Sequence, residues 1–170
     1  MLDNLPLCRG CHGARRIEVA EHRDETLPAP SLPVARTRWI YCAACNASGY
    51  NLGDGESGLI LVRLLGYRRI DTPLAWVYEH PEDGTKPEEG INLWQPRYLE
   101  LLLEGLRAST PNVRLEATAS GDWGVTVDEG GEVYSGGESP TTAVFRAALR
   151  VSVLRELAAR EAERVRSSHD

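Results

Sequence analysis

Two Cys-x-x-Cys pairs constrain this chain more than any other feature of its sequence. Cys8 and Cys11 form the first pair, Cys42 and Cys45 form the second, and the chain contains no other cysteine. Two residues between cysteines allow a tight turn that points both sulfur atoms at one ion, and two such turns complete a tetrahedron of thiolates. We therefore expect these four residues to bind one structural Zn2+ ion.

The two pairs are separated by 30 residues, which is longer than usual for this pattern. Three prolines between residues 26 and 33 indicate a loop, because proline lacks a backbone donor and disfavours both a helix and a central strand. Residues 15–20 and 36–41 are rich in strand-favouring side chains. We interpret the excess length as an insertion at the tip of a hairpin formed by these two strands.

Disulfides and a redox dithiol are the alternatives to a metal site. The cytoplasm disfavours disulfides, and a redox Cys-x-x-Cys motif normally occurs once, near a strand-helix-strand pattern. His12 directly follows Cys11 and is an alternative ligand, but with four cysteines present we expect it at the surface. A site closed by four thiolates has no vacant position for a reacting molecule, so its metal should contribute to folding.

The rest of the chain predicts an antiparallel sheet packed with helices. Residues 113–119, 123–127 and 132–134 are short alternating runs separated by turn formers, which is typical of a meander. A helix with an apolar face is expected from Pro96 to the breakers at 109–111. Ser139 and Pro140 predict the start of a longer helix that ends near Val165, because serine caps a helix and proline suits its first position.

Residues 51–58 contain three glycines and predict a linker between two domains. The apolar run 59–65 fits either a helix or a strand, and residues 74–78 indicate a strand. We therefore expect an α+β fold with a zinc ribbon or knuckle at residues 1–52 and a helix-and-sheet domain at residues 58–166.

Two segments carry a resemblance to a known family. Residues 5–13 read Leu-Pro-Leu-Cys-Arg-Gly-Cys-His-Gly, and residues 39–49 read Trp-Ile-Tyr-Cys-Ala-Ala-Cys-Asn-Ala-Ser-Gly. This pattern resembles the Lar-like restriction-alleviation zinc module of phages. The shared positions are the four cysteines, Gly13, Ala47 and Gly49, and the departures are Arg9, Gly10, His12 and Asn46.

A second resemblance covers the C-terminal part of the chain. Trp94-Gln95-Pro96 before a helix, the lone Trp123 in a strand and residues 139–149 are similar to the phage α/β/α sandwich domain, which has no established chemistry. The two resemblances together imply a phage accessory protein in the host cytoplasm. They imply a non-enzymatic role in which the chain binds a host protein, such as a component of restriction or CRISPR defence.

The charge distribution argues against general wrapping of DNA. The net charge is -6, and residues 68–135 alone carry 13 acidic and six basic residues, whereas phosphate binding needs a concentrated basic face. An alternative hypothesis is a local binding face for nucleic acid or for an acidic partner on the two hairpin strands. Its candidate residues are Arg15, Arg16, Arg36, Arg38 and Trp39, although we favour the interpretation that these are ordinary solvated strand positions.

The sequence contains no recognisable catalytic arrangement, and we expect no enzyme. The four histidines have no nucleophile motif near them. The acids at residues 79–89 could form a two-metal nuclease site, but acids among prolines and glycines usually form a solvated loop. No apolar stretch approaches the ~20 residues that cross a bilayer, so we expect no membrane partner. A homo-oligomer is a further alternative, because exposed strand edges of two subunits can pair.

Overall fold

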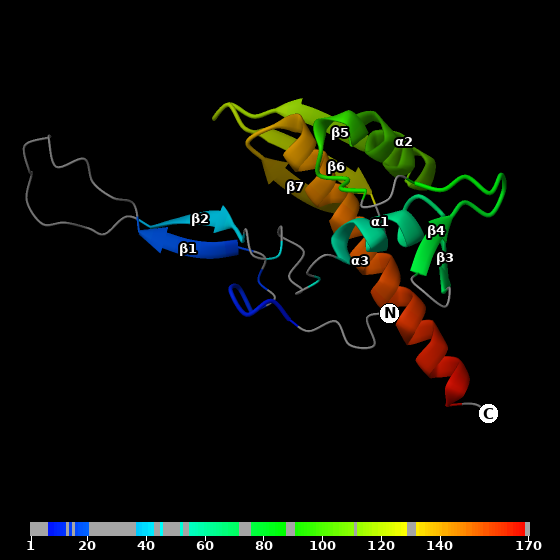
Figure 1. The fold of residues 1–170 in the computed structure, drawn as a ribbon. Helices are drawn as coiled ribbons and strands as arrows, with labels where there is room; N and C mark the ends of the chain where they lie inside the picture. Colours follow the sequence, from blue (N-terminus) through cyan, green and yellow to red (C-terminus); the bar gives the residue numbers. More distant parts are fainter. Residues whose placement is uncertain are drawn as a thin grey trace, which may run out of the picture. The chain divides into compact units, whose positions relative to one another are not determined.

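Helices and short antiparallel strands both occur along the chain, which has the α+β fold that the sequence predicts (Figure 1). The structure is a computed structural model. It describes residues 7–12, 14, 16–20, 37–42, 45, 52, 55–71, 76–87, 91–110, 112–128 and 132–168. Contacts within the chain define two units, Met1–Leu52 and Gly53–Asp170, and each unit is described by itself.

The first unit contains the hairpin that the sequence predicts. β1 (Arg16–Ala20) pairs antiparallel with β2 (Thr37–Tyr41), and the register sets Arg16 opposite Tyr41. The proline-containing segment between the strands lies outside the described residues. One cysteine pair precedes β1 and the other follows β2, so the hairpin brings the two pairs to the same end.

The second unit is built around α3 (Pro140–Ser167). This helix packs against two strands of a sheet and also against two other helices. Between residues 142 and 153, ten of its side chains are buried, which is more than one face of a helix can supply. A helix that is apolar on all sides must be covered on all sides, so α3 is the centre of the unit.

The start of α3 follows from two neighbouring residues. The Ser139 hydroxyl accepts a hydrogen bond from the backbone N–H of Thr142 at 3.1 Å, and Pro140 occupies a first-turn position that needs no donor. The strand before it ends in Gly137, where an added Cβ would lie 2.8 Å from the backbone nitrogen of Ala143. Only glycine therefore allows the sheet to approach the helix this closely.

The sheet is a meander of three antiparallel strands in the order β5, β6, β7, as predicted. The strands are β5 (Val113–Ala117), β6 (Trp123–Asp128) and β7 (Glu132–Gly137). Val125 and Val127 of β6 are fully buried, and α3 contacts β6 and β7. Successive strand residues alternate between the two faces of a sheet, and the opposite face carries the exposed Arg114 and Asp128.

The order of the layers differs from a helix-sheet-helix sandwich. α1 (Glu56–Arg63) and α2 (Leu99–Ser109) pack against α3 instead of covering the second face of the sheet. The layers of the described residues are therefore the sheet, then α3, then α1 and α2. The physical reason is that α3 offers apolar surface on two sides, whereas the second face of the sheet is polar.

Two predictions near the domain boundary need correction or completion. α1 begins at Glu56, so the expected linker at residues 51–58 overlaps the first turn of a helix, and the ambiguous run 59–65 is largely helical. A hairpin follows, formed by β3 (Arg68–Asp71) and β4 (Trp76–Glu79), of which the sequence predicted only the second strand. A short 3-10 turn, η3 (Pro96–Tyr98), leads into α2.

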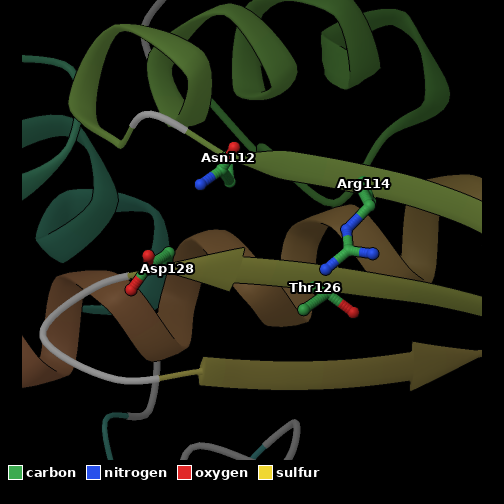
Figure 2. Close-up of a pocket in the computed structure, with 4 residues that line it drawn as sticks. All are labelled: Asn112, Arg114, Thr126 and Asp128. Carbon is green, nitrogen blue, oxygen red and sulfur yellow. The ribbon is translucent and has the colours of Figure 1, made fainter.

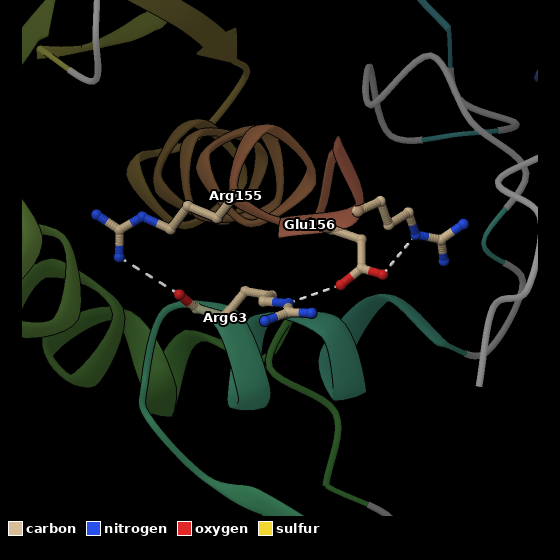
Figure 3. A network of polar contacts seen from close by, with 4 residues as sticks. Arg63, Arg155 and Glu156 are labelled. Carbon is tan, nitrogen blue, oxygen red and sulfur yellow. Dashed lines mark hydrogen bonds and ion pairs between the residues drawn. The ribbon is translucent and has the colours of Figure 1, made fainter. Parts of the chain in front are cut away.

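A buried carboxylate joins α1 to α3 (Figure 3). Glu156 accepts hydrogen bonds from Arg63 at 2.6 Å and from Arg160, one turn further along α3, at 2.7 Å. The Glu156 residue itself is only 5% exposed. Burial raises the pKa of Glu156, but the two arginines outweigh it and hold the pKa below its ordinary value.

Arg155, next to this carboxylate, links α3 to the other two helices. Its guanidinium donates to the backbone carbonyl of Arg63 at 3.3 Å and to the carbonyl and hydroxyl oxygens of Ser109 at 3.3 and 3.1 Å. The C-terminal carbonyls of α1 and α2 have no partner within their own helices, so this cation satisfies groups that a helix end leaves open.

Candidate metal centre

The four cysteines lie together in the first unit, as their spacing predicts. Their Sγ atoms all lie within 4.8 Å of one another, and each residue is at most 6% exposed. The Sγ atoms of Cys8 and Cys42 are 3.8 Å apart, and those of Cys11 and Cys45 are 3.7 Å apart. All four thiols are free, so no disulfide forms among them.

These distances agree with a tetrahedral metal site. A Zn–S bond of ~2.3 Å places any two sulfur ligands of a regular tetrahedron ~3.8 Å apart. A disulfide would need a separation of about 2.05 Å. The two measured contacts therefore have the length that four thiolates adopt around one metal ion, and the four cysteines can hold such an ion.

The loop at the first cysteine pair is a tight turn. The backbone N–H of His12 donates to the carbonyl of Cys8 at 2.7 Å, and the N–H of Ala14 donates to the carbonyl of Cys11 at 2.8 Å. The turn places His12 at φ 48°, in the left-handed region where glycine is the usual residue. The His12 side chain is exposed and lies outside the cysteine group.

The backbone of this turn also prepares a sulfur atom for metal binding. Burial raises the pKa of the Cys8 thiol, but hydrogen bonds from the backbone of Cys11 and Gly10, and from the thiols of Cys45 and Cys42, lower it to about 7. Metal ions bind the thiolate and not the thiol. The hydrogen bonds therefore favour the protonation state that a metal requires.

The apolar side chain that packs against the cysteines is Ile17 of β1, which is half-buried. Sequence reasoning missed this contact, although the alternation of Ile17 and Val19 in the strand was a usable signal. Four cysteines and one isoleucine bury little apolar surface, and small domains of this kind usually depend on a metal or disulfides.

The candidate partner face lies mostly outside what the structure describes. Arg15 and Arg36 are among the residues not described, and only backbone positions are given for Arg16, Arg38 and Trp39. The register sets Glu18 opposite Trp39 and Val19 opposite Arg38. By strand alternation, positions 16 and 39 share one face of the hairpin, and position 38 shares the other with Ile17. The partner face remains a prediction, and the register shows which of its positions lie on the same side of the hairpin.

The acids of residues 79–87 show local structural roles. Asp83 accepts hydrogen bonds from the backbone N–H and the hydroxyl of Thr85, at 2.9 and 2.8 Å, and these bonds lower its pKa. Glu79 lies 3.7 Å from Lys86. Among the described residues, the four cysteines are the one group of three or more possible metal ligands, and Glu88 and Glu89 are not among the described residues.

The fold and the site define an α+β protein with a cluster of four cysteines that can hold a metal ion. None of the described helices combines the length and apolar character needed to cross a membrane. Comparisons with protein families, with curated proteins and with solved structures found no match to this chain.

Proposed function

We propose that the first unit binds one Zn2+ ion and that this ion is structural. The observation that carries the proposal is the set of four buried sulfur atoms within 4.8 Å of one another, of which two pairs are 3.8 and 3.7 Å apart. Four thiolates saturate a tetrahedral ion, so no position is left for a substrate or a water molecule. The zinc would supply folding energy to a unit whose described core consists of the four cysteines and Ile17.

A closed metal site supports a protein that acts by binding. We propose a non-enzymatic accessory protein whose partner is a host protein in the host cytoplasm, with a defence system of the restriction or CRISPR kind as the target. The resemblance of residues 5–49 to restriction-alleviation modules supports this choice. The acidic middle of the chain also favours a protein partner over phosphates, which it would repel.

The metal is tested by elemental analysis of the purified full chain. We expect one zinc per chain, with loss of the metal in a Cys42→Ser, Cys45→Ser double variant and retention in His12→Ala, which alters an exposed neighbour of the ligands. Four thiolates also suit iron, which would give a coloured protein. A chain with iron, or one without bound metal, would contradict the proposal.

The partner is tested by affinity capture with the full chain from host cells, followed by mass spectrometry of the bound proteins. We expect a specific host protein with the native chain and its loss with the metal-free double cysteine variant. Recovery of nucleic acid without any host protein would contradict a protein partner.

Nucleic-acid binding by the hairpin is the second candidate, and the register supports it. By the register, positions 16 and 39 fall on one face of the hairpin, and positions 17 and 38 fall on the other. In a gel-shift assay, Arg16→Ala and Trp39→Ala should then weaken binding, and Arg38→Ala serves as the control from the other face. Equal effects of all three substitutions, or binding insensitive to salt, would count against this candidate.

A further inference from the structure

The open face of the sheet carries a hollow of about 230 Å³ between β5 and β6 (Figure 2). Four polar residues line it, namely Asn112, Arg114, Thr126 and Asp128. Two of these side chains carry opposite charges, and the other two can both donate and accept hydrogen bonds. The hollow lies in the second unit and has no part in the metal site.

The four residues occupy fixed places on two paired strands. Arg114 lies directly opposite Thr126 in the register, and the backbone N–H of Asp128 donates to the carbonyl of Asn112 at 3.3 Å. On the other face of β6, Val125 and Val127 are fully buried in the layer that contacts α3. A site on a strand with a packed back is held more rigidly than a site on a loop.

The two charges have no partner among the residues that the structure describes. In the part of the chain that the structure describes, the side chains of Arg114 and Asp128 form no ion pair or hydrogen bond, and they do not pair with each other. Figure 2 shows the Arg114 guanidinium extending across the strands toward Thr126, while Asp128 lies at the far end of the hollow. Both groups are therefore free to contact a bound molecule.

The presence of both charges restricts what the hollow can bind. Asp128 would repel a phosphate or another simple anion, and Arg114 would repel a metal ion or a simple cation. A small molecule with one anionic and one cationic group satisfies both. Thr126 and Asp128 are two positions apart on one strand, a separation of about 7 Å. An α-amino acid with hydrogen bonds of ~2.9 Å at each end bridges this distance.

We propose that the hollow binds a free α-amino acid. Its carboxylate accepts hydrogen bonds from Arg114 and Thr126, and its ammonium group donates to Asp128 and to the amide oxygen of Asn112. This binding is independent of the metal site and of the host partner proposed above.

The test is an NMR titration of the full, metal-loaded chain with L-alanine as the probe. We expect saturable changes in the backbone amide signals of residues 112–114 and 126–128. N-acetyl-L-alanine lacks the ammonium group and L-alaninamide lacks the carboxylate, so each should bind at least about tenfold more weakly, as expected for a lost charge-assisted hydrogen bond. Equal binding of either analogue would overturn the proposal.

Two substitutions that preserve side-chain size complete the test. Arg114→Gln and Asp128→Asn should each weaken L-alanine binding at least about tenfold. Arg107→Gln, at an exposed arginine of α2 that does not line the hollow, should leave L-alanine binding unchanged. Unchanged signals outside residues 112–128 in each variant establish that the fold is intact. The absence of saturable changes at about 10 mM L-alanine, or equal binding by Arg114→Gln, would overturn the proposal.

Discussion

The two units of this chain differ in the interactions that stabilise each of them. In the first unit, the described core consists of four cysteines and the half-buried Ile17. In the second unit, large apolar side chains such as Phe145, Leu102 and Ile60 are almost completely buried around α3. The first unit is therefore expected to depend on a metal ion, whereas the second can fold on apolar burial alone.

Removal of the metal should have the largest effect and should separate the two units. We expect a strong chelator, or the Cys42→Ser substitution, to unfold the first unit, because structural zinc contributes on the order of 10–16 kcal/mol in small zinc modules. The NMR signals of the second unit should persist. Readdition of Zn2+ should restore the first unit, and readdition of Mg2+ should not.

Joint loss of both units on chelation would break the comparison, because it would mean that the second unit also depends on the metal. If the first unit stays folded without metal, the expected dependence of that unit on the metal is wrong. Thermal unfolding recorded at tryptophan and at far-ultraviolet wavelengths provides an independent measurement of both cases.

The converse substitution is Phe145→Ala in the second unit. Phe145 is 1% exposed, and its ring contacts Trp94 edge to face with the centroids 4.7 Å apart. Removal of the ring should lower the free energy of unfolding of this unit by about 3–5 kcal/mol, because it leaves a cavity beside α3. Denaturant titration measures this loss. Metal content should stay at the level of the native chain, and a fall in metal content would show that the units are coupled.

A smaller loss is expected from Glu156→Gln, which keeps the side-chain size but removes the charge between Arg63 and Arg160. Both arginine side chains are partly exposed, at 30% and 27%, so water offsets part of the cost. We expect a loss of about 1–2 kcal/mol in the second unit, measured by denaturant titration. Glu161→Gln, at an exposed pair with Arg164, is the matched control and should change little.

The pH dependence of this effect follows from the lowered pKa of Glu156. A carboxyl group with a lowered pKa in the folded state stabilises the protein fully above its ordinary value of 4.5, and this stabilisation is lost as the pH falls through the folded pKa. The difference between the native chain and Glu156→Gln should therefore shrink in acid. A difference that stays constant from pH 7 to acid would show that the ion pair is not its cause.

The smallest effect is expected at the turn of the metal site. His12 has φ 48°, which costs a residue with a side chain roughly 1 kcal/mol relative to glycine. His12→Gly should therefore stabilise the first unit by up to about 1 kcal/mol, measured as tighter metal retention against a competing chelator. Ala14→Gly, a neighbouring position without a positive φ, should not increase retention.

The features that could be predicted from the sequence are those with a local pattern. The cysteine cluster follows from two short motifs, and the start of α3 follows from Ser139 and Pro140, whose roles depend on their immediate neighbours. The three strands of the meander follow from alternation and turn residues. In each case, the deciding interaction lies within a few positions along the chain.

The features that could not be predicted depend on contacts between distant residues. β3 is only four residues long, and its charged sequence Arg-Arg-Ile-Asp carries no alternation; its pairing with β4 defines it. The position of α1 and α2 on α3 depends on contacts between elements far apart in the sequence, and the burial of Glu156 beside Arg63 joins residues 93 positions apart. No short stretch of the sequence contains both partners, so the layer order and the buried ion pair could not be predicted from local patterns.

The central place of α3 has a consequence for synthesis on the ribosome. This helix follows all the other helices and strands in chain order, yet the sheet and the other two helices pack against it. Until α3 emerges from the ribosome, Val125 and Val127 cannot pack against it. The nascent second unit therefore exposes an apolar, aggregation-prone strand while the helix is being translated. The first unit is synthesised much earlier, so it can fold around a metal ion before α3 has been translated.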